Sequence, residues 1–167
     1  MVEPFEVEET SKKLEGENIK FRSFLKNRAD GDELDAHFLN LHNELFPTYD
    51  CSKCRNCCKT YDTYLEETEI KSIAEFLGQT ENDFKNEHLI QTEEGYKIKG
   101  KPCSFLCADG ICQIQEFRPS ACRDFPFTDK PERLFSLFGI LEFAEVCPVV
   151  LEILEELKKI YGFRNRV

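Results

Sequence analysis

The stretch Cys51-Ser-Lys-Cys54-Arg-Asn-Cys57-Cys58 places four thiols within eight residues. Core packing does not explain thiols at this density, and few of them could pair with one another as unstrained disulfides. A C-x2-C step brings two thiolates onto one tight turn, from which both can reach the same metal ion or cluster. The stretch therefore predicts a metal-binding loop around which the fold is organised.

The cysteine count and the expected compartment bear on what these thiols do. The chain of 167 residues holds nine cysteines. Its first residues are acidic and lack the positive start and apolar stretch of a signal peptide, and no apolar run approaches the roughly 20 residues of a membrane span. We therefore expect a cytoplasmic protein with reduced thiols. Nine cysteines then indicate metal ligands or redox groups ahead of disulfides.

The net charge of −10 limits the possible partners. It repels nucleic acid phosphates and anionic lipid, so we expect neither nucleic acid nor membrane as a partner. Lys53, Arg55 and Lys59 interleave with the cysteine cluster. These cations are either solvated on a loop or compensate thiolate charge, since nearby cations lower the pKa of a cysteine.

Apolar spacing and capping residues predict helices, and turn-flanked stretches predict hairpins. The predicted helices cover 18–28, 33–46, 67–77, 80–89 and 148–161. Asp32 is the expected N-cap of the second and Thr80 starts the fourth. The predicted hairpins cover 91–99 and 103–112. The apolar stretch 135–143 fits strand or helix.

These elements predict an α+β fold, a small cysteine-rich metal-centred domain with short β-hairpins, an N-terminal helical preface and a C-terminal amphipathic helix. Residues 1–46 form the N-terminal tail and helical preface, with residues 1–16 loosely held. Residues 47–167 form the cysteine-cluster metal-binding domain, which includes the C-terminal helix as one structural unit.

The cysteine spacing leaves the metal open. Cys51-x2-Cys54-x2-Cys57 has the spacing of the first three cysteines in bacterial ferredoxin motifs, whose last ligand precedes a proline, as Cys147 precedes Pro148. Zinc accepts the same thiolates in tetrahedral geometry, although only one C-x2-C knuckle is evident.

Eight cysteines are candidate metal ligands, enough for two four-thiolate sites or for one site with spare ligands. Cys107, just before a turn, is expected not to bind metal. Cys58 follows Cys57 directly, so it could reach a second centre, lie beside the ligands or be a small buried hydrophobe. The candidates are Cys51, Cys54, Cys57, Cys58, Cys103, Cys112, Cys122 and Cys147.

Other residues carry weaker signals. Arg118 and Arg123 flank Cys122, where they form surface salt bridges, or offset thiolate charge, or hold an anionic substrate. The three histidines lie on predicted helices and are expected to be ordinary helix residues. Phosphate-binding, hydrolase and dinucleotide motifs are absent from the sequence, so whether the protein is an enzyme stays undecided.

The ordered motifs resemble the YkgJ-type cysteine-cluster family over about residues 48–150. They are the C-x2-C-x2-C-C run, Pro-Cys-x-Phe-Leu (102–106), Asp-Gly-x-Cys-x-Ile (109–114), Arg-Pro-x-x-Cys-Arg-x-Phe-Pro (118–126) and Cys-Pro (147–148). The resemblance implies a zinc- or iron-chelating or iron–sulfur protein, with the same eight cysteines as its motif residues. Arg55 stands where many relatives have glycine, and Gln115 where tyrosine is frequent.

Three hypotheses follow. The first is an iron–sulfur protein with a redox or electron-transfer role and an unknown protein or redox partner, with Cys51, Cys54 and Cys57 as core ligands. The second is a zinc-binding structural or interaction domain. The third is a protein-lysine methyltransferase-like enzyme or subunit, because the cluster motif also resembles part of flagellin lysine methylase, a much longer enzyme that uses S-adenosylmethionine.

Overall fold

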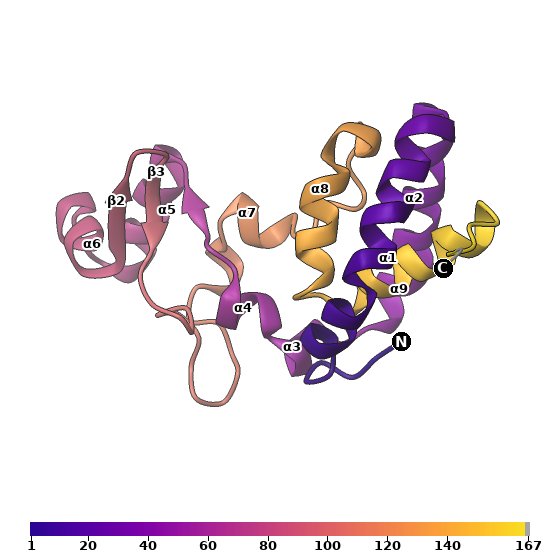
Figure 1. The fold of residues 1–167 in the computed structure, drawn as a ribbon. Coiled ribbons are helices and arrows are strands. Elements are labelled where there is room, and N and C mark those ends of the chain that lie inside the picture. The colour runs from indigo at the N-terminus through magenta and orange to yellow at the C-terminus, as the bar shows by residue number, and fades with distance from the viewer. Residues whose placement is uncertain (166–167) are drawn as a thin grey trace. The chain divides into compact units, whose positions relative to one another are not determined.

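The elements of the chain group into two units in the computed structural model, which describes residues 1–165 (Figure 1). The first unit is helical and combines Met1–Asp50 with the C-terminal stretch that starts at Pro126. The second unit is Cys51–Phe125. That the C-terminal helix and the cysteine loops form one structural unit stays a prediction; within the first unit, this helix packs on the N-terminal helices.

Within residues 1–165, the first unit is built from four helices and one short turn of 3-10 helix. Its core is made of side chains that are almost completely buried, among them Phe21, Phe38 and Ile153. Helix–helix packing of such apolar stripes is the main source of stability for a unit of this kind. The elements are α1 (Val7–Arg28), α2 (Gly31–Leu45), η1 (Phe46–Thr48), α8 (Arg133–Ala144) and α9 (Pro148–Ile160).

Two local predictions in this unit need correction. Helix α1 begins at Val7 rather than at 18, because glutamates in its first turn favour the N-terminal end of a helix dipole and pair with lysines one turn later (Lys12 Nζ–Glu8 Oε1, 2.5 Å). The N-cap of α2 is Asp30 rather than Asp32, since its carboxylate accepts the N–H groups of residues 32 and 33. The undecided stretch 135–143 lies within helix α8.

The second unit contains a small antiparallel sheet, two medium helices and several single helical turns. Strand order is β1-β3-β2, with Tyr64 opposite Lys97 and Ile90 also opposite Lys97. The elements are α3 (Cys51–Cys54), α4 (Asn56–Thr60), β1 (Tyr64–Leu65), α5 (Glu67–Leu77), α6 (Glu81–His88), β2 (Leu89–Thr92), β3 (Gly95–Ile98), η2 (Gln115–Phe117) and α7 (Ser120–Arg123).

The predicted α+β fold is confirmed, and so are the helix 67–77 and the hairpin that contains β2 and β3. The prediction of a second hairpin at 103–112 is wrong. These residues form an isolated antiparallel β-bridge between Leu106 and Cys112 instead of two paired strands. The N–H of Cys103 donates to the carbonyl of Cys58 (2.8 Å), so it cannot continue a strand pair across the loop. Within residues 1–165, none of the helices is long and apolar enough to cross a membrane.

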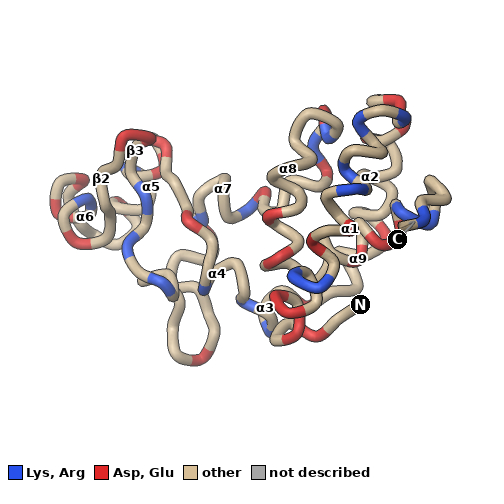
Figure 2. Tube along the Cα trace, in the orientation of Figure 1, with Lys and Arg blue, Asp and Glu red and all other residues tan. Residues whose placement is uncertain are grey.

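One apolar cluster forms the core of the second unit and supports the cysteine loops. It contains Phe84 and Phe105, whose rings stack with centroids 6.1 Å apart. Cys103 and Cys112 pack against this cluster from outside. The segments that carry Cys103 and Cys112 are therefore anchored on an apolar core. In both units, acidic and basic positions are interspersed along the chain (Figure 2).

Candidate metal centre

The cysteine run folds as two short helical turns joined by a left-handed residue. Arg55, between α3 and α4, has a φ of +57°, a conformation that favours glycine. Its Nε donates to the carbonyl of Ser52 (3.1 Å). This turn separates Cys51 and Cys54 on α3 from Cys57 and Cys58 on α4.

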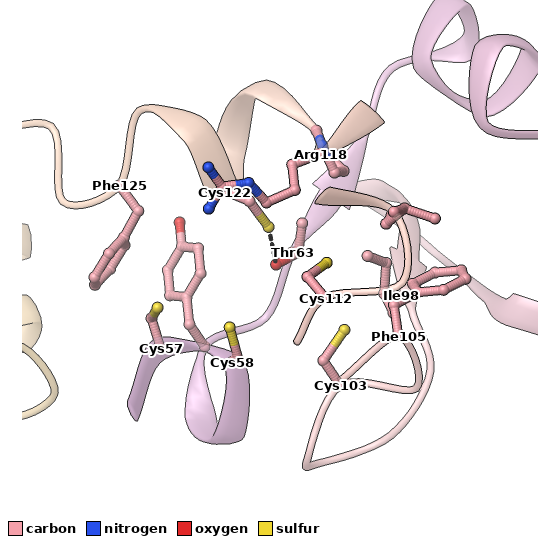
Figure 3. A pocket seen from close by; sticks show the side chains of 13 residues that line it. Cys57, Cys58, Thr63, Ile98, Cys103, Phe105, Cys112, Arg118, Cys122 and Phe125 are labelled. Carbon is pink, nitrogen blue, oxygen red and sulfur yellow. Dashed lines mark hydrogen bonds between the residues drawn. The ribbon is translucent and has the colours of Figure 1, made fainter. Parts of the chain in front are cut away.

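Five of the eight predicted ligands line one cavity of the second unit, which has a volume of about 50 Å³. The side chains of Cys58, Cys103, Cys112 and Cys122 surround a common space, while Cys57 lies toward Phe125 (Figure 3). Apolar residues form much of the wall. The cavity is lined by Cys57, Cys58, Tyr61, Thr63, Ile98, Cys103, Phe105, Cys112, Ile114, Arg118, Pro119, Cys122 and Phe125.

Backbone hydrogen bonds hold the first three of these four segments together. The N–H of Cys103 donates to the carbonyl of Cys58, which ties the loop after β3 to α4. The N–H of Gln113 donates to the carbonyl of Phe105 (2.8 Å), which keeps Cys112 beside Cys103. Main-chain hydrogen bonds thus join segments that are far apart in the sequence.

Helix α7 brings the fourth thiol to the cavity. The N–H of Ser120 donates to a carboxylate oxygen of Glu69 on α5 (2.7 Å), which anchors the start of α7. Within this turn, Cys122 has its Sγ 3.3 Å from the Oγ1 of Thr63 (Figure 3). Thr63 is buried, so this hydroxyl is held in place beside the thiol.

The four thiols differ in acidity. A hydrogen bond from Cys57 and, after it, the positive charges of Arg55 and Arg118 lower the pKa of Cys58 to about 6. Burial raises the pKa of Cys103 and of Cys112, and it raises the pKa of Cys122 to about 11. At neutral pH, Cys58 is therefore mainly a thiolate. The other three cavity cysteines are thiols that must lose a proton before they can bind metal.

These thiols also raise one another's pKa values. Charges at Cys58 and Cys112 act on Cys103, and charges at Cys58, Cys103 and Cys112 act on Cys122. This repulsion acts between thiols that line the same cavity. A bound cation would convert this repulsion into shared attraction.

Arg118 lies at the same cavity, whereas Arg123 does not line it. The Nε of Arg118 is buried and has no hydrogen-bond partner among residues 1–165. Its charge lowers the pKa of Cys58 and of Cys112, in each case against the larger opposing effect of burial. Of the two alternatives for Arg118, compensation of thiolate charge is thus supported. Arg123 is exposed and donates to the carbonyl of Arg118.

The donor set fits a thiophilic metal. Four thiols and a cationic guanidinium around an apolar space suit Zn²⁺ or iron, which prefer thiolate ligands. No three His, Cys, Asp or Glu side chains of the described chain form a finished metal site as they stand. A tetrahedral zinc site with zinc–sulfur bonds of about 2.3 Å would hold its sulfurs about 3.8 Å apart.

The three other predicted ligands are not among the residues that line this cavity. Cys51 is exposed and Cys54 is buried on α3, and neither lines the cavity. Cys147 is the buried N-cap residue of α9 and belongs to the helical unit. Cys107, expected not to bind metal, is exposed. All nine cysteines lie within residues 1–165 and are thiols rather than disulfides.

Sequence reasoning missed two polar residues of the cavity. Thr63 contacts Cys122 across 59 positions of sequence. Tyr61 packs its ring on Phe125 with centroids 4.8 Å apart, and burial raises the pKa of its phenol. Their closeness in sequence to Cys58 was the one available signal, and residue type alone did not distinguish them from ordinary loop residues.

Comparison with known proteins identifies the cysteine-bearing part of the chain. Neither the curated proteins nor the solved structures gave a match. A family model described as "CxxCxxCC: Putative zinc- or iron-chelating domain" matches residues 50–148, which is more than half of the chain. The matched region contains all four thiols that surround the cavity. The chain therefore belongs to the CxxCxxCC family.

Proposed function

We propose that this chain is a cytoplasmic metal-binding protein whose second unit holds an iron–sulfur cluster with a redox or electron-transfer role. The observation that carries the proposal is the convergence of Cys58, Cys103, Cys112 and Cys122 on one cavity. The spacing-based hypothesis had Cys51, Cys54 and Cys57 at the core of the site. The proposal shifts the centre to the four thiols that surround a common space.

The surroundings of the thiols support a redox role. A bound cluster would supply one-electron chemistry, and the protein would set its potential through burial, charge and hydrogen bonds to sulfur. Apolar side chains such as Ile98, Phe105 and Ile114 would keep water from the centre. Arg118 would offset the negative charge of the thiolates, and Thr63 would donate a hydrogen bond to the sulfur of Cys122.

Zinc is the second candidate, because four thiolates in an enclosed space also suit a structural Zn²⁺ ion. In that case the metal would stabilise the fold, since it joins α4, two loop segments and α7, and the function would be partner binding. The methyltransferase hypothesis gains no support from the geometry of the cavity.

Anaerobic purification followed by metal analysis distinguishes iron–sulfur from zinc. We expect a brown protein with iron and acid-labile sulfide, whose visible absorption is bleached by dithionite. A colourless protein with stoichiometric zinc would refute the iron–sulfur proposal and leave the thiolate site standing.

Two matched variants test the site itself. Cys112 lines the cavity, and Cys107 lies exposed on the same loop. Cys112→Ser should lose most of the bound metal, and Cys107→Ser should retain it. Full metal content in Cys112→Ser would show that the cavity is not the metal site.

A further inference from the structure

Two phenylalanines one turn apart on α8 are exposed. Phe135 is 81% exposed and Phe138 is 61% exposed, and on α1 Ile19 is 49% exposed. Helices α1 and α8 pack on each other within the first unit. Single exposed apolar residues are ordinary, but a group of large ones on neighbouring helices is typical of an interaction site.

Each of the two rings has a basic side chain of α1 beside it. The Nζ of Lys26 lies 5.2 Å from the ring centroid of Phe135, and the Cζ of Arg22 lies 5.8 Å from that of Phe138. These are cation–π distances. Since Arg22 and Lys26 are four positions apart, their Cα atoms are separated by about 6 Å along the helix axis.

Neither cation is neutralised by the described part of the chain. Arg22 and Lys26 form no ion pair there, and the buried Nε of Arg22 has no hydrogen-bond partner. Further toward the N-terminus of α1, Lys12 and Lys13 instead pair with glutamates at 2.5 and 2.6 Å. In a chain with a net charge of −10, this face thus carries two cations that form no ion pair within residues 1–165.

We propose that the α1–α8 face, formed by Ile19, Arg22, Lys26, Phe135 and Phe138, docks an acidic amphipathic segment of another protein. Apolar side chains of that segment would cover the two rings, where aromatic and arginine residues give the largest contributions to binding. Carboxylates one helical turn apart would pair with Arg22 and Lys26, and this charge complementarity would set the orientation.

The probe is a helical peptide with leucines on one face and two glutamates one turn apart, titrated into the full chain and followed by fluorescence anisotropy. The comparison peptide has lysines in place of both glutamates. We expect the glutamate peptide to bind and the lysine peptide not to bind. Phe135→Ser should weaken binding at least about tenfold, as a residue at the centre of an interface does.

Charge reversal gives the sharper test. Arg22→Glu with Lys26→Glu should abolish binding of the glutamate peptide and create binding of the lysine peptide. The matched control, Lys12→Glu with Lys13→Glu, changes the charge of the same helix equally and should leave both titrations within about twofold, because these lysines lie outside the face.

Four results would overturn the proposal. The first is that the wild type does not bind the glutamate peptide, and the second is that Phe135→Ser binds it as tightly as the wild type does. The other two are signs of a different occupant. The first such sign is that the wild type binds vesicles of phosphatidylcholine and phosphatidylserine and that Phe135→Ser abolishes this binding, which would make the occupant a lipid surface. The second is self-association in sedimentation that Phe135→Ser abolishes, which would make the occupant a second copy of the chain.

Discussion

The contact between Thr63 and Cys122 allows a perturbation of the metal centre that removes no ligand. Thr63→Val keeps the shape of a buried side chain and deletes only the hydroxyl that lies 3.3 Å from the Sγ of Cys122. Because valine and threonine are nearly equal in volume, the packing around the cavity should change little. The variant therefore isolates the hydrogen bond to sulfur.

The expected size of the effect depends on the charge of Cys122. Burial raises the pKa of Cys122 to about 11, so the metal-free protein at pH 7 holds a neutral thiol there. A neutral hydrogen bond contributes about 1 kcal/mol or less, whereas a bond to a charged group contributes about 1.5–3 kcal/mol. Metal binding needs the thiolate. The hydroxyl of Thr63 should thus favour the bound state by the difference, about 0.5–2 kcal/mol, and its loss should weaken metal binding about twofold to thirtyfold.

Competition with a chromophoric zinc chelator measures this affinity, and urea unfolding of the metal-free protein measures its stability. Thr92→Val is the matched control, since it also deletes a hydroxyl hydrogen bond, to the carbonyl of Gly95 (2.9 Å), in the hairpin away from the cavity. We expect Thr63→Val to lose affinity with little loss of stability, and Thr92→Val to keep affinity. Equal metal affinity in wild type and Thr63→Val would refute the reasoning.

Two further predictions concern the apo cavity and its loop. In the metal-free protein at pH 7, iodoacetamide should label Cys58 ahead of Cys122, because the pKa of Cys58 is about 6 and that of Cys122 is about 11. The labelling rate of Cys58 should fall as the pH drops below 6. Peptide mapping that finds Cys122 labelled first would contradict this prediction. Gly78→Ala should lower the free energy of unfolding by about 1 kcal/mol, and Gly100→Ala should lower it by more. Both glycines have a positive φ, but of the two only Gly100 has a backbone oxygen 2.9 Å from the position that a Cβ would take. Equal losses of stability in urea unfolding would count against this reasoning.

The sequence predicted best the features that depend on neighbours along the chain. Helix α5 ends at Leu77 as expected because Gly78 adopts the left-handed cap with a φ of +68°. Thr80 caps α6 as expected, since its hydroxyl accepts the N–H of Asp83 (3.2 Å). Such signals are complete within a few residues, so no tertiary information is needed to interpret them.

The composition of the cavity could not be predicted in the same way. Cysteine type and spacing identified candidates, but which thiols meet depends on contacts such as that between Cys58 and Cys103, which are 45 positions apart (103 minus 58). The chain direction changes at Arg55, and this turn leaves Cys51 and Cys54 outside the cavity that Cys58 enters. A C-x2-C spacing indicates that two thiols can share a metal, and the local backbone decides whether they do.

Arg55 explains how a costly backbone conformation can persist next to a metal centre. A non-glycine residue with a φ of +57° costs about 1 kcal/mol relative to glycine. Glycine would remove that strain, but it would also remove a guanidinium that lowers the pKa of Cys58. The same residue thus makes the turn that aims α4 at the cavity and supplies positive charge to the first thiolate there. Because the three other thiols must lose protons against burial, a cation fixed at this turn lowers the electrostatic cost of assembling four thiolates.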